Sequence, residues 1–245
     1  MSARRFLVSP GQLKSELIIL EPGEAGHAQR VLRLQAGDEI WLLDGLGNQA
    51  RAVVERLNPM LCRVRERPPW PSPRPRIIML LAVSKNQAMD ILAQKLTELM
   101  VDEIRLFNAA RSVAEAGGSK NDRWERLAGQ ALKQCGAARA PRFVAPPYPN
   151  GNLDEVLGQA PPSRLERALK IAAYEGEQKT NLAQIMPLQA PEEVWVIIGP
   201  EGGLSKEEIE LAQERGFVSC RLTSSILRSE TAALVTAGCL RCHWE

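Results

Sequence analysis

The chain has 245 residues, of which 44% are hydrophobic and 24% charged, and its net charge is only +2. This length predicts one large or two modest domains, and the composition is that of an ordinary folded protein. No apolar run approaches the roughly 20 residues that span a bilayer, and the first residues lack the apolar core of a signal peptide. The cysteines are odd in number and irregularly spaced, which favours reduced thiols. We therefore expect a cytoplasmic protein that does not bind a membrane.

A proline-rich segment, residues 68–76, divides the sequence, because it excludes a helix and favours a stiff, extended connector. Residues 1–67 contain short apolar runs separated by turn residues, with one amphipathic helix at 24–34, and predict a small β-barrel or sheet. This part is rich in arginine, which favours either contact with phosphate or a solvated charged surface. Residues 77–245 alternate strands and helices, which is typical of an α/β domain with a mainly parallel sheet.

Strands of the larger domain are predicted at Ile77–Val83, Glu103–Asn108, Leu169–Tyr174, Val194–Ile198 and Val218–Leu222. Amphipathic helices are predicted near residues 89–99, 122–138, 205–216 and 229–240. The last helix is too apolar for a solvated end of the chain, so we expect it to pack against the sheet or another subunit. The second carries a polar, basic face that includes Arg126, Gln130, Lys133 and Gln134, which indicates solvation or phosphate contact.

The most informative motif is Gly199-Pro-Glu-Gly-Gly203, which follows a buried strand directly and precedes a capped helix at Ser205. Ligands of α/β folds bind at the carboxyl ends of strands. Gly202 and Gly203 tolerate positive φ and allow a ligand to approach the backbone closely. A tight structural turn is the alternative. The motif is neither a Walker loop nor G-x-G-x-x-G, so binding of phosphate is the weaker functional interpretation.

A second loop, residues 222–233, also joins a strand end to a helix start, so the two loops are expected to form two walls of one pocket. Three polar residues stand at this helix start: Arg228, Glu230 and Thr231. They are either functional or purely structural, as an ion pair together with a cap of the helix. The C-x-x-C-H pattern at 239–243 does not predict haem, because no export signal precedes it, and no second cysteine pair completes a zinc site. The chain has only two histidines, which argues against a Ser-His-Asp hydrolase.

The order of several blocks resembles the RsmE family of SPOUT methyltransferases across essentially the whole chain. The blocks are Arg4-Arg5-Phe6, His27-Ala-Gln-Arg-Val-Leu-Arg33 before Gly37-Asp38, Lys95-Leu-Thr-Glu-Leu99, Arg111-Ser112, Gln130-Ala-Leu-Lys-Gln134 with Arg139 and Pro141, Gly199–Gly203, and Ile226-Leu-Arg-Ser-Glu-Thr-Ala232. Two positions depart from the family, which usually has glycine at Met100 and at Thr223. A side chain at Thr223 is expected to narrow the cofactor pocket.

The resemblance implies a PUA-like RNA-binding β-barrel followed by a SPOUT domain with a deep trefoil knot, assembled as a homodimer. It implies methylation of N3 of a uridine in the decoding region of 16S ribosomal RNA in the small subunit. The methyl donor would be S-adenosyl-L-methionine, and no metal would be required. The knot follows only from the resemblance, since such topologies are very rare.

Site residues follow from this chemistry, in which N3 of uracil must lose its proton while a cation stabilises the resulting anion. We expect Arg228 or Arg5 as the cation, and Glu230 as the base or as the positioner of the arginine. The residues predicted to bind the cofactor are Ala173, Glu175, Ile198, Gly199, Glu201, Gly202, Gly203, Leu222, Ser224, Ile226 and Leu227. Those predicted to bind RNA are Arg4, Arg30, Arg33, Arg111, Lys133, Gln134 and Arg139.

Two other classes of function are weighed against this hypothesis. A non-catalytic RNA-binding or ribosome-assembly protein with a degenerate cofactor site is favoured by Thr223 and opposed by the intact glycine-rich loop. A nucleotide-binding hydrolase would need a phosphate loop and metal-binding carboxylates, neither of which the sequence contains.

Overall fold

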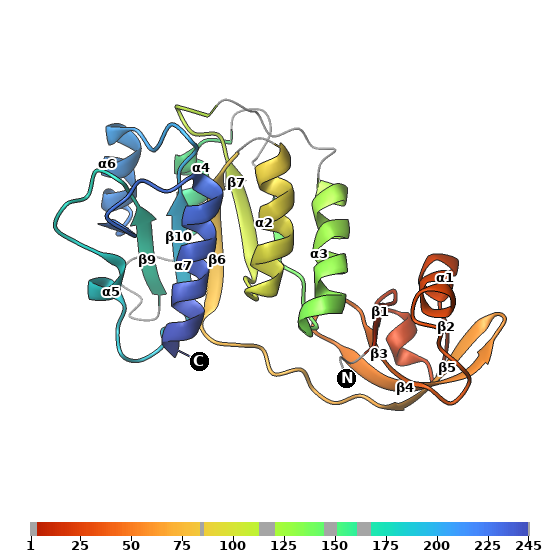
Figure 1. The fold of residues 1–245 in the computed structure, drawn as a ribbon. Helices are drawn as coiled ribbons and strands as arrows, with labels where there is room; N and C mark the ends of the chain where they lie inside the picture. Colours follow the sequence, from red (N-terminus) through yellow and green to blue (C-terminus); the bar gives the residue numbers. More distant parts are fainter. Residues whose placement is uncertain (1–3, 84–85, 113–120, 145–150, 161–167, 245) are drawn as a thin grey trace. The chain divides into compact units, whose positions relative to one another are not determined.

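The computed structural model describes residues 4–83, 86–112, 121–144, 151–160 and 168–244. Contacts divide these residues into two compact units (Figure 1). The first comprises the described part of Met1–Ser72 together with Gly129–Ala140, and the second Pro73–Ala128 with the described part of Pro141–Glu245. The predicted domain boundaries at residues 67 and 77 stay a prediction, and nothing in the local sequence indicates that residues 129–140 pack with the N-terminal unit.

The first unit is built on a mixed five-stranded sheet in the order β1-β3-β4-β5-β2. Its elements are β1 Arg5–Leu7, the short 3-10 helix Gln12–Lys14, β2 Leu17–Ile19, α1 Pro22–Arg30, β3 Glu39–Leu43, β4 Gln49–Leu57 and β5 Met60–Glu66. Along β4, buried Ala50, Ala52 and Val54 alternate with more exposed residues, so one face of the strand covers the core. Register shifts in β4 bend the sheet. The small β domain is therefore confirmed, although β2 was not predicted and the helix ends earlier than expected.

The second unit contains a six-stranded sheet in the order β11-β9-β10-β6-β7-β8, in which every pair is parallel. The strands are β6 Arg76–Ala82, β7 Glu103–Phe107, β8 Arg142–Val144, β9 Ala168–Ala173, β10 Glu193–Ile198 and β11 Val218–Cys220. Residues 77–82 of β6 are all buried, as expected for a parallel sheet covered on both faces. The five predicted strands are confirmed, and β8 was missed because three residues carry too little pattern.

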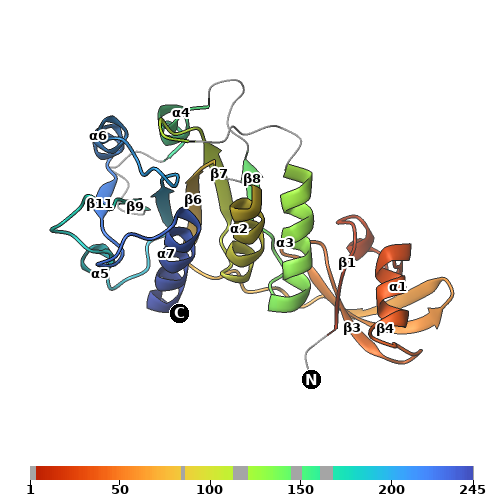
Figure 2. The same ribbon diagram turned by 45° about the horizontal axis from the view of Figure 1, so that its top comes forward.

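Helices cover both faces of this sheet (Figures 1 and 2). They are α2 Asn86–Glu98, α3 Asn121–Cys135, α4 Leu153–Leu157, α5 Leu182–Ile185, α6 Lys206–Glu214 and α7 Ser229–Trp244, of which α3 contributes to both units. Helices α4 and α6 share one core with Ile78, Leu80 and Trp195, while α2 and α7 pack side by side on the other face. No helix in the described residues is long and apolar enough to cross a bilayer.

Helix α7 packs against the sheet, which is one of the two expected arrangements. Arg241 anchors its last turn, because its buried guanidinium donates to Pro75 O at 2.7 Å, to Leu99 O at 3.2 Å and to Met100 O. The same group forms an ion pair of 3.3 Å with Asp102. The first turn of α7 lies at the carboxyl edge of the sheet, where the candidate site is found.

Candidate functional site

Three loops begin side by side at the carboxyl ends of neighbouring strands. Ala173 of β9 is in register with Ile198 of β10 and with Cys220 of β11, so the strands end together. The three loops then run through residues 174–178, 199–205 and 221–228. Adjacent strand ends in a parallel sheet are the usual ligand-binding location of α/β folds. The cofactor residues predicted from the sequence lie on these three loops or at the strand ends that precede them.

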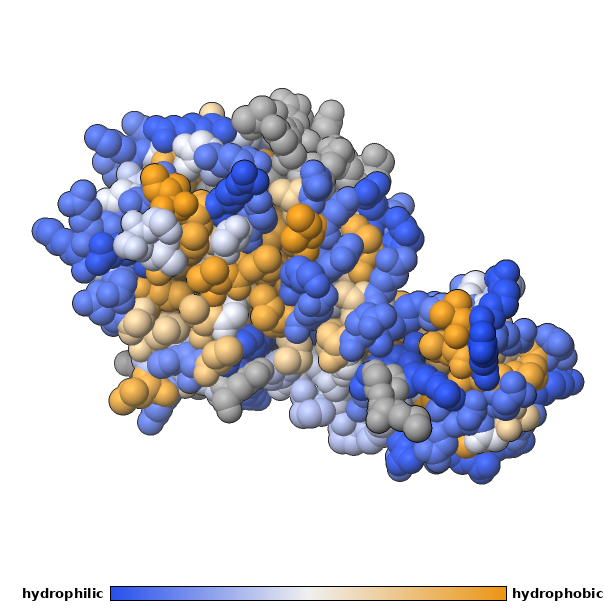
Figure 3. Space-filling view, viewed as in Figure 1, coloured by the Kyte–Doolittle hydropathy of each residue, from blue (hydrophilic) through white to orange (hydrophobic). Residues whose placement is uncertain are grey.

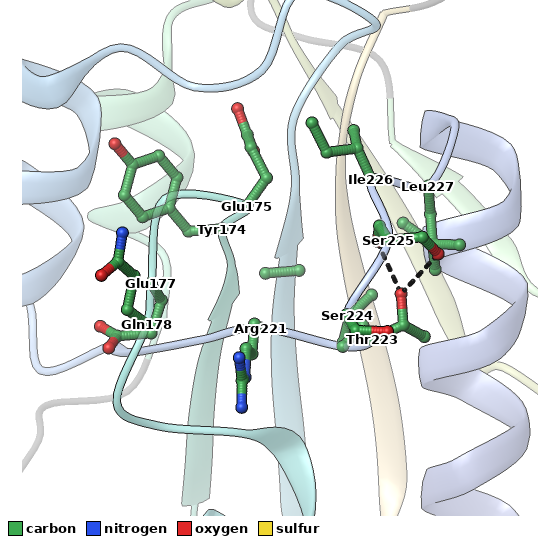
Figure 4. Close-up of a pocket in the computed structure, with 13 residues that line it drawn as sticks. Tyr174, Glu175, Glu177, Gln178, Arg221, Thr223, Ser224, Ser225, Ile226 and Leu227 are labelled. Carbon is green, nitrogen blue, oxygen red and sulfur yellow. Dashed lines mark hydrogen bonds between the residues drawn. The ribbon is translucent and has the colours of Figure 1, made fainter.

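A cavity of about 180 Å³ lies between the loops that follow β9 and β11 (Figure 4). Figure 4 shows Tyr174, Glu175, Glu177 and Gln178 on one side and residues 223–227 on the other. The lining residues are Ala173, Tyr174, Glu175, Glu177, Gln178, Arg221, Leu222, Thr223, Ser224, Ser225, Ile226, Leu227 and Ala232. Six of the predicted cofactor residues are among them, namely Ala173, Glu175, Leu222, Ser224, Ile226 and Leu227.

The loop Gly199–Ser205, which we call the glycine loop, touches this cavity wall through Glu175. A Cβ on Gly203 would overlap the Glu175 carboxylate, and Gly203 has a φ of +71°. A Cβ on Gly199 would lie 3.0 Å from Leu204 N, and one on Gly202 would lie 3.1 Å from the Cβ of Arg111. The expectation of positive φ therefore holds for Gly203, whereas Gly202 is required for close packing. The loop is therefore closely packed at Gly199 and Gly202, and the positive φ of Gly203 disfavours any other residue there.

Side chains from three different elements hold the glycine loop in place. Arg111, after β7, donates to Gly202 O at 3.1 Å, and Ser229 at the start of α7 donates to Gly199 O at 2.7 Å. One carboxylate oxygen of Glu208 accepts from Ser205 N at 2.8 Å, and the other accepts from Ala110 N at 2.9 Å. The first of these bonds belongs to the capping box of α6. The second joins two strand-end loops and has no local sequence signal, so neither it nor the role of Ser229 was predicted.

The loop after β11, residues 221–228, is more exposed. Thr223, Ser224, Ser225 and Ile226 are exposed or half-buried, and Thr223 Oγ1 donates to Ser225 O at 2.7 Å. Arg228 is exposed at the first turn of α7, where Glu230 is half-buried, and no ion pair joins these two described residues. The interpretation of Arg228 and Glu230 as a structural ion pair is therefore wrong.

Protonation at the cavity is set by burial and by backbone hydrogen bonds. The backbone N–H groups of Lys179 and Thr180 donate to the Glu177 carboxylate and hold its pKa below the usual value. Burial raises the pKa of the Cys220 thiol to about 12, so this thiol is not a nucleophile near neutral pH. Glu177 therefore serves as an ionised turn residue, which makes it a poor acceptor for a substrate proton.

The remaining predicted residues lie mainly in the first unit. Arg5 is on β1 and lines a separate cavity together with Arg4, Lys133 and Gln134. Arg30 and Arg33 are exposed on and just after α1, and the side chain of Arg139 donates to Leu46 O at 3.3 Å. The other predicted cofactor residues lie at or next to the glycine loop and do not line the 180 Å³ cavity; they are Ile198, Gly199, Glu201, Gly202 and Gly203. In the described residues no cluster of three metal-ligating side chains is found.

Comparison with known proteins places the chain in a family. The family model of an RNA methyltransferase domain matches residues 71–241, and that of an RNA methyltransferase PUA domain matches residues 20–66. The ribosomal RNA small subunit methyltransferase E of Mycobacterium tuberculosis is 28% identical over 100% of this chain and 95% of that protein. The chain is a member of the RsmE family of RNA methyltransferases.

Solved structures extend the RsmE likeness to the whole fold. A probable rRNA-methyltransferase from Porphyromonas gingivalis is 31% identical, with a TM-score of 0.82 over 98% of each chain. A methyltransferase from Legionella pneumophila, solved with the cofactor SAM bound, is 27% identical, with a TM-score of 0.80 over 99% of this chain and 98% of that one. The predicted fold class, a SPOUT-type α/β domain preceded by a PUA-like domain, is confirmed. The trefoil knot stays a prediction.

Proposed function

We propose that this RsmE-family chain methylates N3 of a uridine in the decoding region of 16S ribosomal RNA, with S-adenosyl-L-methionine as methyl donor. The observation that carries the proposal is the glycine loop, which lies at the carboxyl edge of the sheet, is closely packed at Gly199 and Gly202, and has a positive φ at Gly203. Curated relatives that carry the name of ribosomal RNA small subunit methyltransferase E, and the Legionella structure with SAM bound, support the same assignment.

The residues at the site fit this cofactor, because Glu175 and Ser224 supply polar groups to the cavity wall and Ile226 and Leu227 supply apolar surface. S-adenosyl-L-methionine, when bound, supplies an electrophilic methyl group. We assign its binding to the three strand-end loops, with Ala173, Glu175, Leu222 and Ser224 in the cavity wall. The remaining contacts would come from Ile198, Gly199, Glu201, Gly202 and Gly203, together with Ile226 and Leu227.

The chain's own part in the reaction is to hold an unpaired uracil and to remove the N3 proton. N3 lies on the Watson–Crick edge, so only an unpaired base can react. We assign the stabilising cation to Arg228 and the proton acceptor, or the positioner of Arg228, to Glu230, since both lie at the first turn of α7. Arg5 is the alternative cation. Because Ser229 is tied to Gly199, the orientation of this turn is coupled to the glycine loop.

Assembly as a cytoplasmic homodimer with a knotted SPOUT domain forms part of the same proposal. Figure 3 shows hydrophobic residues gathered over α2 and α7 on one face of the larger unit. On these two helices, Ile91 of α2 is 40% exposed and Leu234 of α7 is half-buried. An apolar surface of this kind is suited to a subunit interface.

The deciding experiment is transfer of methyl groups to unmodified small-subunit RNA, followed by primer extension. A methyl group on N3 blocks base pairing, so we expect one new stop in the decoding region. Arg228→Ala should lower kcat by about 100-fold, in line with the loss of one charge-stabilising group, whereas Arg142→Ala on the distant edge strand β8 should have no effect. Methyl transfer without a stop would overturn N3 as the target. Cofactor and RNA binding without transfer would favour the non-catalytic RNA-binding alternative.

A further inference from the structure

A cavity of the first unit has a volume of about 470 Å³ and is lined by seven side chains from three segments. Arg4 and Arg5 come from the start of the chain, and His27 and Leu32 from α1 and the turn after it. Gln130, Lys133 and Gln134 come from α3, where a spacing of three and four residues places them on one face. Of the seven lining residues, only His27 and Leu32 lie within the match to the PUA family model. Residues outside that domain therefore help to form the cavity.

The hydrogen-bond donors of the cavity suit an anion. Three of its lining residues are cations, and no carboxylate lines it among the residues the structure describes. Acids outside the cavity fix two of these cations, since Glu24 pairs with Lys133 at 2.7 Å and Asp38 pairs with Arg4 at 2.9 Å. Arginine and lysine held in this way can donate to phosphate oxygens without first losing side-chain freedom.

The remaining lining residues suit a base rather than a bare anion. Each of Gln130 and Gln134 offers both a donor and an acceptor, which is what recognition of a base edge requires. Leu32 is half-buried and gives the cavity an apolar wall. A cavity of this size cannot admit a duplex, whereas an unstacked nucleotide can enter it.

We propose that this cavity binds one unpaired nucleotide of the RNA substrate, with its phosphate on Arg4, Arg5 and Lys133 and its base against Gln130 and Gln134. The inference rests on the proposed RNA-methylating function and adds an anchoring site to it. This inference takes Arg228, and not Arg5, as the stabilising cation. The anchored nucleotide is then not the one that is methylated, because the glycine loop, Arg228 and Glu230 belong to the other unit and no carboxylate among the described residues lines the cavity to accept the N3 proton. Loss of the anchor should therefore change the affinity for RNA, and the chemical step should stay as it is.

The test uses the full chain and three variants, all of which keep the net charge. Lys133 cannot be changed alone, because Glu24 Oε2 is buried without a hydrogen-bond partner in the described residues and its Oε1 depends on Lys133. The variant Glu24→Gln/Lys133→Gln removes both charges of this pair. Its matched control is Glu55→Gln/Arg63→Gln, which removes another ion pair of the same unit that does not line the cavity. A third variant, Gln134→Ala, changes an exposed side chain.

Binding is measured by fluorescence anisotropy with a labelled single-stranded oligouridylate at several salt concentrations. We expect Glu24→Gln/Lys133→Gln to weaken binding by about tenfold and to lower the salt slope by about 0.7, which corresponds to one phosphate contact on a single strand. Gln134→Ala should weaken binding by about threefold with an unchanged slope. The control pair should match the unchanged protein, and equal weakening by the control would overturn the proposal.

Two further measurements distinguish an anchoring site from a catalytic site and from a simple anion site. In methyl transfer, Glu24→Gln/Lys133→Gln should raise KM for RNA and leave kcat and the Kd of S-adenosyl-L-methionine unchanged, while a fall in kcat alone would overturn the anchoring role. Uridine monophosphate should compete with the oligonucleotide better than inorganic phosphate, and equal competition would overturn recognition of the base. If no RNA is methylated but the binding differences persist, the proposed function fails and the nucleotide site stands.

Discussion

The two loops that follow β10 and β11 lie at the same edge of the sheet and are built in opposite ways. The glycine loop is closely packed at Gly199 and Gly202, and Arg111, Glu208 and Ser229 hold it from three elements. The loop after β11 carries exposed side chains, and Thr223 bonds within the loop itself. The proposed cofactor site therefore has one braced wall, the glycine loop beside the cavity, and one exposed wall, the loop that lines the cavity. Glycine alone would make a loop flexible, so the rigidity of the first wall is a tertiary property.

If the glycine loop is the braced wall, adding a side chain at one of its glycines should lower stability and cofactor affinity more than any other change. Gly199→Ala places a Cβ 2.9 Å from Leu204 Cγ and 3.0 Å from Leu204 N, and Leu204 is buried. We expect a loss of about 1–3 kcal/mol in the free energy of unfolding, as in other overpacked sites. The Kd of S-adenosyl-L-methionine should rise by more than about tenfold, or roughly 1.4 kcal/mol. Chemical unfolding and calorimetric titration measure the two effects.

Gly23→Ala is the matched control for this change, because a Cβ at that helical glycine meets no atom within 4 Å. It should leave cofactor binding unchanged and stabilise the chain slightly, since alanine is the better helix former. If Gly199→Ala bound the cofactor as tightly as this control does, the glycine loop would not be the rigid wall.

The two hydrogen bonds that Glu208 accepts should be the next most sensitive to substitution. In Glu208→Gln the side chain can still complete the capping box of α6. Glutamine has a single acceptor oxygen, however, so its two terminal atoms cannot accept from Ser205 N and Ala110 N as the carboxylate does. We expect a loss of about 1 kcal/mol in stability from the bond that is lost, and a several-fold weaker affinity for the cofactor. Glu210→Gln, an exposed change on the same helix, is the control, and equal effects of the two would contradict a special role of Glu208.

Ser229 tests the coupling between the glycine loop and the first turn of α7. Ser229→Ala removes the 2.7 Å bond to Gly199 O, which should cost about 0.5–1.5 kcal/mol. If that coupling orients Arg228, kcat should fall together with cofactor affinity, whereas a bond with a merely structural role would lower thermal stability alone. The exposed Thr231→Ala serves as the control variant in the same turn.

This contrast also marks what the sequence could and could not predict. Strand periodicity and the position of Gly199–Gly203 located the sheet, its carboxyl edge and the three loops, because these depend on local pattern. The bond from Ala110 to Glu208 joins residues 98 positions apart, and the cavity of the first unit joins β1 to α3. Such contacts follow from the chain's path through space, which no local pattern encodes. Arg111 illustrates the limit, since its RNA contact stays a prediction and its hydrogen bond to Gly202 O had no local sequence signal.

Substitutions in the loop after β11, residues 221–228, should change cofactor affinity least, and Thr223 tests this directly. Thr223 lines the cavity, where the RsmE family usually has glycine, and its hydroxyl bonds to Ser225 O at 2.7 Å. Thr223→Gly removes that bond but also removes volume from the cavity wall, and the backbone entropy of glycine opposes order by about 0.5–1 kcal/mol. Because these effects partly cancel in an exposed loop, we expect the Kd of S-adenosyl-L-methionine to change by less than about threefold, or roughly 0.7 kcal/mol. A gain of tenfold or more in the same titration would show that Thr223 obstructs the pocket, and the non-catalytic alternative would then become the better account of this chain.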